Sequence, residues 1–572
     1  MTSLEYKNLI SKIPKEVSYV TETLEKAGFE AYIVGGCVRD LLMSQILSGA
    51  EVEREPKDWD ITTNAKPDQI IGLFEKTIYE NIFGTVIVCV PIQSDVSYET
   101  QENDVSCETL EARTSKLEPN FMIEVTPYRV EAKYSDFRHP DEVKFSDHLE
   151  DDLKRRDFTV NAMAFRPNGH DNSLKDIKSD KCIVDFYNGQ QDIKDRMLKA
   201  VGNPDDRFEE DALRMLRAVR FACQLNFSIS YETSESILRN SDLIKKISAE
   251  RIRDEFEKII MSTNPSVGIV MLQKFNLLKN IIPELEEGID CEQSGEHIYD
   301  VWNHLLHALQ HSADKNWPLE IRLSALFHDI GKPKAKRLTE QNNDFSGPRF
   351  PLPNKSPSEI EARSDYKKSL SRSDSRKLFT FYGHEVVSAR MTKKIMERLK
   401  FPKKEIDLVE KLVRNHMFFS DTELITLSAV RRIITKVGKE NIWSLMNVRE
   451  SDRVGMKKKE TPYRLRKYFA MIEEALHDPI SVGQLKINGE FMIKELGITP
   501  GPRMGWILNA LLEEVLDAPE KNSIGHLSEL VKSLNMLGDE ELKTLGDRGK
   551  EKKEELEEEE ITKLHEKHGV RK

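Results

Sequence analysis

A pair of aspartates gives this chain its clearest candidate for chemistry. Asp58 and Asp60 alternate along a segment expected to be a strand, which points both carboxylates to one face. Hard oxygen donors on one face suit Mg²⁺, which leaves coordination positions open for substrate phosphates. Metal ions held there can activate an attacking hydroxyl and stabilise a leaving pyrophosphate. The pattern therefore indicates nucleotidyl transfer.

A glycine turn precedes the aspartates. Gly35 and Gly36 follow the apolar run 31–34, which predicts a strand, and the residues after them are expected to begin a helix. Glycines let the backbone approach a phosphate, and the N–H groups of the helix then face it. We expect Arg39 to help cradle a triphosphate there. A glycine pair alone is usually a turn, and Asp-x-Asp alone is usually a solvated strand end, but their order favours the functional interpretation.

Composition narrows the class of protein. The chain has 572 residues, of which 38% are hydrophobic and 32% charged, and its length suits roughly three to five domains. Its apolar runs are too short to span a bilayer, and its first residues lack a signal-peptide core. The six cysteines are scattered without a C-x-x-C pair, which favours a reducing compartment. We therefore predict a cytoplasmic protein that does not associate with membranes.

The expected architecture is α+β, with a sheet confined to the first third and helices after it. We expect a helix over 5–28 and strands at 31–34, 83–90 and 123–132. The predicted domains are a head at 1–165, a neck at 166–285, a third domain at 286–435, a C-terminal helical domain at 436–535 and a charged, disordered tail at 536–572. Polar stretches at about 93–120 and 339–377 are predicted to be insertions.

Further polar residues could contact a nucleotide. Arg156 and Asn161 suit triphosphate and ribose hydroxyl contacts. Asp211 and Arg214 are three residues apart in a predicted helix over 209–222, where such a pair is usually an intrahelical ion pair. Alternatively, an acceptor beside a donor complements the Watson–Crick edges of cytosine and adenine, which predicts CTP and ATP as substrates. Glu124 is a weaker candidate for a third carboxylate.

The segments VGGCVRD with DWDITT, RRDFTVNA, EDALRMLRAVRFA and ERIRDEF occur in this order. Together they resemble class II tRNA nucleotidyltransferases (CCA-adding enzymes) and their poly(A) polymerase relatives in the DNA polymerase β superfamily. The resemblance implies a head that binds Mg²⁺ through Asp58 and Asp60. It also implies a neck in which Asp211 and Arg214 select the base, followed by helical domains that hold tRNA.

The same resemblance implies that Arg217 lies near the nucleotide and Arg156 near its sugar or phosphates. Residues 131–140, with Asp136 and Arg138, resemble the family's flexible loop, which is associated with the switch from C to A addition. The loop favours full CCA addition. A poly(A) polymerase or A-adding enzyme remains an alternative, and a non-catalytic RNA-binding protein has no need of paired carboxylates.

A set of histidines and aspartates lies in the third domain. His328-Asp329 at the end of an apolar helix resembles the HD superfamily, which hydrolyses phosphoesters with bound divalent metals. Imidazole suits transition metals such as Ni²⁺, Mn²⁺ or Fe²⁺. We predict that these residues bind a metal; the alternative is a degenerate HD fold that binds none. A metal-dependent phosphohydrolase is a second alternative for the function of the chain. We expect His307 and His311 to be packing or surface residues. The predicted ligands are His304, His328, Asp329, His384, His416 and Asp421.

The C-terminal region carries candidates for RNA contacts. Arg503 lies in a glycine-rich turn over 501–505 before an apolar helix, which suits a phosphate contact, although a helix cap explains the turn equally well. Lys457 and Lys458 would extend an RNA track despite the net charge of −12. The predicted partners are tRNA, CTP and ATP, and the predicted assembly is a monomer or homodimer.

Overall fold

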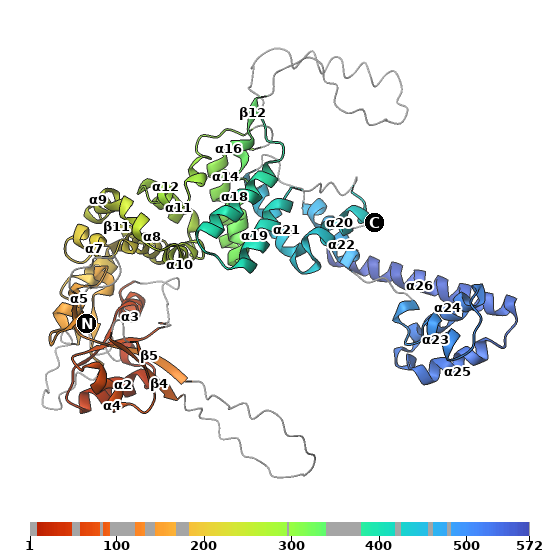
Figure 1. Ribbon diagram of the computed structural model, residues 1–572, viewed down its shortest axis with the longest axis horizontal. Helices are drawn as coiled ribbons and strands as arrows, with labels where there is room; N and C mark the ends of the chain where they lie inside the picture. The colour runs from red at the N-terminus through yellow and green to blue at the C-terminus, as the bar shows by residue number, and fades with distance from the viewer. Residues whose placement is uncertain are drawn as a thin grey trace, which may run out of the picture. The chain divides into compact units, whose positions relative to one another are not determined.

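The computed structural model describes part of the chain in detail and divides it into two compact units. The described residues are 8–47, 56, 58–80, 84–91, 120–131, 143–167, 182–293, 297–338, 379–417, 425–455, 462–476 and 482–570. One unit comprises Met1–Ser294 and Tyr299–Glu410, and the other Gly295–Ile298 and Lys411–Lys572. The main sheet lies in the first unit, and helices predominate among the described residues that follow it (Figure 1).

A seven-stranded sheet forms the core of the head, in the order β3-β4-β5-β2-β1-β8-β9. Strand β2 is parallel to β5, and the other neighbours are antiparallel. The strands are β1 (Ala31–Val34), β2 (Asp60–Thr63), β3 (Thr77–Glu80), β4 (Thr85–Pro91), β5 (Asn120–Pro127), β8 (Ala164–Phe165) and β9 (Ile183–Val184). Because β9 belongs to this sheet, the head continues beyond the predicted boundary at residue 165.

The predicted strand at 31–34 is confirmed as β1, and the one at 83–90 corresponds to β4. The predicted strand at 123–132 is only partly right. Strand β5 ends at Pro127, which has no N–H to extend the ladder. The chain then forms β6 (Arg129–Glu131), which pairs with β7 (Val143–Phe145) in a separate two-stranded sheet.

One face of the sheet is buried and the other is partly open. Ile123 and Val125 are fully buried, whereas Glu124 between them is exposed. Helices α2 (Lys15–Lys26) and α4 (Pro67–Leu73) pack against the sheet. The predicted helix over 5–28 is interrupted rather than continuous. Residues 8–10 are helical, residues 11–14 are not, and α2 begins after Pro14, whose backbone is extended.

Two further elements of the head bear on the site. Helix α3 (Gly36–Ile46) starts directly after β1, as the glycine turn predicts. Helix α5 (Leu149–Lys154) is followed by the short 3₁₀ helix η2 (Thr159–Asn161). Helix α6 (Gly189–Lys194) and strand β10 (Met197–Leu198), which pairs with β11 (Ser228–Ile229), lead to the neck.

The neck corrects one prediction. The expected single helix over 209–222 is broken at Asp211, whose backbone is extended, with φ −145° and ψ 101°. The Asp211 carboxylate accepts a hydrogen bond from the Leu213 N–H at 3.1 Å, as residues that begin helices do. The neck helices are α7 (Pro204–Glu210), α8 (Leu213–Leu225), α9 (Tyr231–Asn240), α10 (Ala249–Ile260), α11 (Pro265–Lys274), α12 (Leu278–Ile281) and α13 (Pro283–Glu286).

Helices continue to the end of the first unit. Helix α15 is buried along its whole length after its first two residues, and the buried Arg322 within it donates hydrogen bonds to the carbonyls of Ile260 and Ser262. The elements are α14 (Val301–Asp314), α15 (Leu319–Phe327), α16 (Lys332–Ala335), β12 (Arg337–Leu338), β13 (Phe379–Thr380), α18 (His384–Arg398) and α19 (Lys403–Asn415), whose last turn belongs to the second unit.

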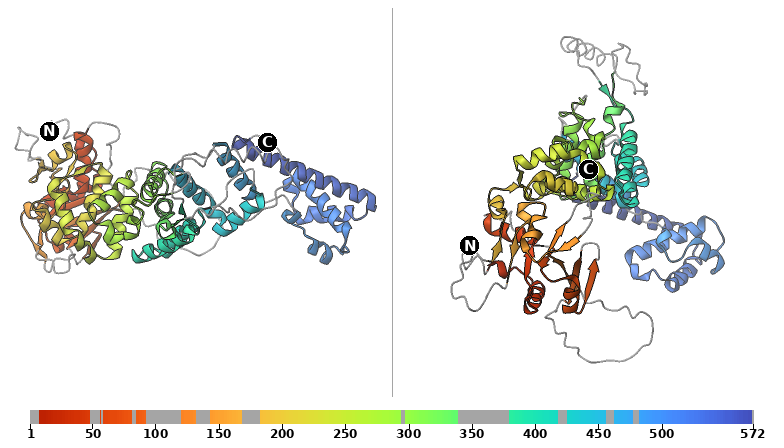
Figure 2. Two further views of the ribbon diagram at one scale, coloured as in Figure 1. Left: turned by 90° about the horizontal axis from the view of Figure 1, so that it is seen from above. Right: turned by 60° about the vertical axis from the view of Figure 1, so that its left-hand side comes forward.

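The second unit is helical, and its charged tail is not disordered as predicted. Residues 539–567 form one helix, α26, which lies along α24 (Figures 1 and 2). Leu542 is buried, and Gly546 and Gly549 let the two backbones approach closely. The helices are α20 (Leu427–Val437), α21 (Ile442–Asp452), α22 (Pro462–Leu476), α23 (Gly489–Lys494), α24 (Pro502–Asp517), α25 (Ile524–Leu534) and α26 (Asp539–Lys567). Across the described ranges, no helix has the length and apolar character needed to cross a membrane.

Candidate functional site

Acidic side chains gather where β2 and β5 lie side by side. Asp60 is the register partner of Glu124 on the parallel strand β5, so the two side chains share a face of the sheet. Asp58 lies two residues before Asp60, and the buried Trp59 separates them. The structure therefore brings together the carboxylates that the sequence singled out.

The glycine turn contacts this carboxylate group directly. Gly35 has a φ of +84°, and a Cβ on it would lie 3.1 Å from Nη1 of Arg156 and 3.2 Å from Oδ2 of Asp60. A side chain at position 35 would be strained and would displace both charged groups. Arg156 is held from behind by Asp152, 3.2 Å from its Nη2. The turn thus brings its backbone close to both an arginine and a carboxylate.

Burial and charge set the ionisation of this group. Burial raises the pKa of Asp60, Asp58 raises it further, and Arg156 opposes both effects. Burial also raises the pKa of the neighbouring Cys37 thiol to about 12, which keeps it protonated and unsuited to act as a nucleophile or metal ligand. A cation beside Asp60 would offset the repulsion from Asp58 that raises the pKa of Asp60, and carboxylate oxygens fit Mg²⁺.

A buried hydrogen-bond chain connects the head with the neck. Arg39 donates from Nη1 to Oδ1 of Asn161 at 2.7 Å, and Asn161 donates to Oδ1 of Asp157 at 3.1 Å. Arg217 donates to Oδ2 of Asp157 from Nε at 2.8 Å and Nη2 at 2.6 Å. Three residues predicted to bind nucleotide are therefore joined through Asp157. Asp157 was not among the predicted site residues, although it lies inside the RRDFTVNA segment.

Arginines also surround the ring of Phe221 in helix α8. The guanidinium carbons of Arg39, Arg217 and Arg220 lie 5.2, 5.4 and 4.1 Å from the ring centroid.

Burial opposes the charge of Asp157, but Arg217 and Asn161 outweigh burial and lower its pKa to about 2. Asp157 therefore stays ionised and holds Arg217 in place at neutral pH.

Asp211 and Arg214 lie near the start of α8, and each is paired with another residue. Asp211 accepts from Nη2 of Arg251 at 2.7 Å, and Arg214 donates to Glu210 at 2.6 Å and to the carbonyl of Arg155 at 2.8 Å. The interpretation of Asp211 and Arg214 as one intrahelical ion pair is therefore wrong. Glu210 and Arg251 were missed, although both stand within the segments EDALRMLRAVRFA and ERIRDEF.

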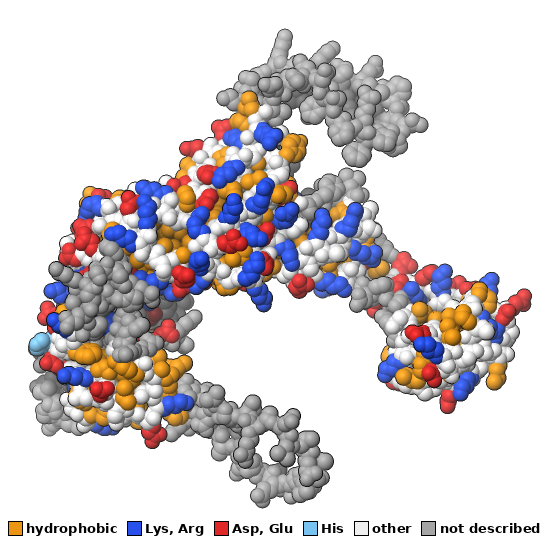
Figure 3. Space-filling model, in the orientation of Figure 1, with side chains coloured by type: hydrophobic (Ala, Val, Ile, Leu, Met, Phe, Trp, Pro, Cys, Tyr) orange, Lys and Arg blue, Asp and Glu red, His pale blue; other side chains and the backbone are white. Residues whose placement is uncertain are grey.

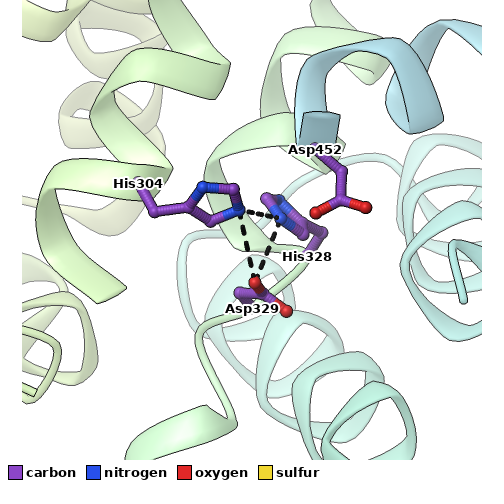
Figure 4. A group of neighbouring side chains, drawn as sticks. All are labelled: His304, His328, Asp329 and Asp452. Carbon is purple, nitrogen blue, oxygen red and sulfur yellow. Dashed lines mark hydrogen bonds and ion pairs between the residues drawn. The ribbon is translucent and has the colours of Figure 1, made fainter. Parts of the chain in front are cut away.

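A second polar cluster lies in the helical part of the first unit. The Nε2 atoms of His304 and His328 are 3.0 Å apart, and Oδ2 of Asp329 lies 3.4 and 3.3 Å from them. Figure 4 shows these three side chains turned toward one another. The Nε2 of His384 lies 3.1 Å from Oδ1 of Asp329. All four side chains are buried, with at most 6% of any residue exposed.

The histidine rings are oriented by backbone carbonyls. The Nδ1 atoms of His328 and His384 lie 2.8 and 2.7 Å from the carbonyls of Ala325 and Phe381. These acceptors place the ring proton on Nδ1, so each Nε2 presents a lone pair toward Asp329. Backbone-held imidazoles of this kind are the usual partners of a metal ion. Imidazole nitrogens with a carboxylate fit a transition metal better than Mg²⁺.

Lys332 is a component of this cluster that the sequence analysis missed. Its Nζ lies 2.5 Å from Oδ2 of Asp329 and 2.6 Å from Oε1 of Gln293. Burial opposes the charge of Asp329, but Lys332 and His328 outweigh burial and hold its pKa well below the ordinary value. The ring of His307 stacks on Tyr299, and the ring of His311 packs edge-on against Trp317. Both contacts agree with the prediction that these two histidines are packing or surface residues.

Other predicted site residues belong to the second unit or lie outside the described residues. His416 is one of those in the second unit, and it is buried, with its Nδ1 2.6 Å from the carbonyl of Val413. Arg503, also in the second unit, bonds to the carbonyls of Asn535 and Leu537 and pairs with Asp539. Its guanidinium therefore secures the turn between α25 and α26. Asp136, Arg138, Asp421, Lys457 and Lys458 lie outside the described residues.

Surface charge varies along the first unit. Lys and Arg side chains are numerous over its helical part, whereas hydrophobic side chains gather on the head (Figure 3). Such basic side chains suit contacts with a phosphate backbone in spite of the net negative charge.

Family models match most of the chain. Residues 31–199 match the poly A polymerase head domain, and 226–289 match the probable RNA and SrmB-binding site of polymerase A. Residues 295–453 match the HD domain, and 377–531 match tRNA nucleotidyltransferase domain 2. The HD match takes in Asp452, a buried carboxylate 3.0 Å from Arg449 that the sequence analysis did not single out.

Curated relatives match the N-terminal part. The CCA-adding enzyme of Lactobacillus delbrueckii subsp. bulgaricus is 42% identical over 253 residues, which cover 44% of this chain and 52% of the relative. The CCA-adding enzyme of Lactiplantibacillus plantarum is 37% identical over 275 residues, covering 47% and 56%. The chain thus spans about half the length of the curated relatives it matches.

A solved structure shares the fold. The CCA-adding enzyme of Bacillus stearothermophilus in complex with CTP has a TM-score of 0.50 and 23% identity, covering 91% of this chain and 97% of that one. The fold and the matched domains define a polymerase-type nucleotidyltransferase head joined to an HD domain. The chain thus carries a head that matches the poly A polymerase head domain and a helical region that matches the HD domain.

Proposed function

We propose that this protein adds or repairs the CCA end of tRNA without a template, using CTP and ATP. The observation that supports this most strongly is the convergence of Asp58, Asp60 and Glu124 with Gly35 and Arg156. Such a group suits the transfer of a nucleotide to a hydroxyl. The relatives that carry the same N-terminal segments are named CCA-adding enzymes. Because tRNA and nucleotides are cytoplasmic, we place the reaction in the cytoplasm.

In the proposed reaction, the 3′ oxygen of tRNA forms a bond to the α-phosphorus of CTP or ATP. The bond from that phosphorus to the bridging oxygen breaks, and pyrophosphate leaves. Asp58 and Asp60 would hold Mg²⁺, which supplies Lewis-acid activation and charge neutralisation when bound. Gly35, Gly36 and Arg39 bind the triphosphate by backbone N–H groups and a guanidinium.

Arg156 and Asn161 orient the sugar and phosphates in this proposal. Arg156 already stands next to Asp60, and Asn161 is tied to Arg39. Arg217 stabilises the triphosphate from the neck, where Asp157 keeps its guanidinium fixed. The chain's contribution is thus positioning and charge stabilisation around the reacting phosphorus.

Base choice is assigned to Asp211 and Arg214. A carboxylate acceptor and a guanidinium donor together match the amine and ring nitrogen of cytosine and adenine. Glu210 and Arg251 hold these side chains at the start of α8. On binding, Asp211 and Arg214 would exchange part of these contacts for the base edge.

The direct test supplies the purified chain with Mg²⁺ and a tRNA that ends at the discriminator base. With CTP and ATP together we expect two C residues and then one A, and no product from the Asp58→Ala variant. Repeated A addition without C would favour the alternative, a poly(A) polymerase or A-adding enzyme. No incorporation of either nucleotide would overturn the proposal.

We give the name HD cluster to the group of His304, His328, Asp329 and His384. We also propose that this cluster binds a transition metal, Ni²⁺, Mn²⁺ or Fe²⁺. The support is the arrangement of His304, His328 and His384 around Asp329, with ring nitrogens directed by backbone carbonyls. A metal bound there could hydrolyse phosphoesters, which is the alternative activity for this region. Metal analysis of the purified chain, with Asp329→Ala as the comparison, tests binding. The predicted assembly, monomer or homodimer, stays a prediction.

A further inference from the structure

The open face of the head sheet carries more than the acidic group. Register partners connect four strands in one row, from Asp60 to Glu124, from Glu124 to Ile87 and from Ile87 to Ile78. Partners in register point to the same face. Met122, two residues before Glu124 on β5, also points to this face. The carboxylates are therefore continued by three apolar side chains across β5, β4 and β3.

These apolar side chains are accessible to a partner. Ile78 is 51% exposed and Met122 is 64% exposed, while Ile87 between their strands is half-buried. We call Ile78, Ile87 and Met122 the apolar ledge. Exposed apolar side chains grouped beside a charged site are typical of a binding surface.

The order of strands decides which substrate meets the ledge. Strand β1 and the glycine turn lie on one side of β2, and β5, β4 and β3 lie on the other. In the proposed reaction Gly35, Gly36 and Arg39 bind the triphosphate, so pyrophosphate leaves on the β1 side. In-line transfer places the attacking and leaving oxygens on opposite sides of the phosphorus. The attacking 3′ hydroxyl must then approach from the β5 side, above Glu124.

We propose that the apolar ledge binds the sugar and base faces of the last nucleotides of the acceptor RNA. This inference rests on the proposed function and assigns residues to its second substrate. Neighbouring strands lie about 4.8 Å apart, so Ile87 and Ile78 lie roughly 10 and 14 Å from Asp60 across the sheet. Stacked nucleotides rise by about 3.4 Å each, so the ledge covers the last few nucleotides.

The side chains suit such a contact chemically. Apolar side chains on a flat strand surface pack against the faces of bases and riboses and impose no base pattern, because they offer no hydrogen-bond donors or acceptors. An enzyme that extends many tRNAs needs this tolerance at the end of the acceptor. The ledge would therefore contribute to acceptor binding and positioning without contributing to nucleotide choice.

The test compares serine variants of the ledge with a matched control. Ile78→Ser and Met122→Ser remove exposed apolar surface with little expected effect on stability. We expect each to raise KM for tRNA about fivefold to tenfold and to leave KM for CTP unchanged. Tyr79→Ser is the control, since Tyr79 is 43% exposed on the same strand and points to the opposite face. KM values for tRNA that are equal in all three variants and the wild type would overturn the proposal.

A crosslinking experiment gives a readout that does not depend on turnover. A tRNA whose terminal nucleotide is 4-thiouridine is irradiated with the wild-type chain, and the linked peptides are identified by mass spectrometry. Crosslinks to peptides of β3, β4 or β5 support the ledge, and crosslinks confined to other segments overturn it. If the wild type extends tRNA and the ledge variants have an unchanged KM for tRNA, the role of the ledge is refuted but the proposed function is not. If the wild type adds no nucleotide, both the proposed function and the role of the ledge are refuted.

Discussion

The two polar clusters of the first unit are built on opposite principles. In the head, Asp58 and Glu124 are exposed on the open face of a sheet, and guanidiniums approach from the next segments. In the HD cluster, His328 and Asp329 are at most 1% exposed and lie among helices. The exposed group in the head is accessible to a large polyanion such as RNA. The buried group around Asp329 is accessible only to a ligand as small as a single ion.

The donors differ as much as the access. Carboxylate oxygens and guanidinium nitrogens around Asp60 complement phosphates and a hard cation, whereas imidazole nitrogens around Asp329 complement a softer one. In the proposed function, the two donor sets would therefore favour different ions. This comparison predicts that either site can be disabled without loss of the other.

The largest expected effect is the loss of nucleotidyl transfer in Asp60→Asn. Replacing the charged carboxylate of Asp60 with a neutral amide weakens the binding of the cation. We expect kcat for CTP addition to fall by about a thousandfold. The metal content of the HD cluster, measured by elemental analysis, should stay the same. A parallel fall in that metal content would contradict the independence of the two sites.

The converse variant is Asp329→Ala in the HD cluster. Removal of the central carboxylate should weaken retention of the transition metal by about a hundredfold or more, measured by dialysis and elemental analysis. CCA addition should remain within about twofold of the wild type, provided that circular dichroism shows a folded protein. His307→Ala, outside the cluster, is the matched control and should retain the metal. Equal retention by all three proteins would show that the cluster holds no metal.

A smaller effect is expected for base choice in Asp211→Ala. The carboxylate would no longer accept from the exocyclic amine, so discrimination of CTP against UTP should fall by about tenfold to a hundredfold. The measurement is the ratio of kcat/KM values for the two nucleotides. Arg251→Lys keeps a charge beside Asp211 and should preserve most of the discrimination. An unchanged ratio in Asp211→Ala would remove this residue from base selection.

The smallest predicted effect concerns stability. The pKa of Asp157 is lowered to about 2, below its ordinary value of 3.8. Its ionised form therefore stabilises the fold above about pH 4, and this contribution is lost as the pH falls toward 2. Asp157→Asn should lower the free energy of unfolding by about 2 kcal/mol at neutral pH. Urea unfolding at several pH values should show the difference from the wild type shrinking below pH 4, and a constant difference would contradict the assignment.

Much of the head was predictable because its elements follow local rules. The strand at 31–34, the glycine turn and the helix after it rest on hydrophobic pattern and on glycine's tolerance of positive φ. The helix break at Asp211 was not predicted. Its side chain competes for the backbone N–H of Leu213, a choice that the helical periodicity of the segment does not reveal.

Partners distant in sequence were the main omissions. Asp157 and Arg251 form ion pairs that depend on how distant segments pack, and no spacing rule connects Asp157 with Arg217. The tail helix α26 was missed for a similar reason. Its sequence is dominated by charge, and its few small and apolar residues find a place to pack on other helices, chiefly on α24.

The contact between α24 and α26 has a consequence for how the C-terminal helix can vary. A Cβ on Gly546 would lie 2.8 Å from Cα of Trp506, and one on Gly549 would clash with the backbone oxygen of Asn509. These two close contacts fix the position of α26 along its own axis. If α26 shifted by one turn, side chains would occupy the two contact positions and would clash with the α24 backbone. The register of this helix therefore depends on Gly546 and Gly549, while its charged residues add ion pairs such as those of Arg548 with Glu513 and Lys552 with Asp517.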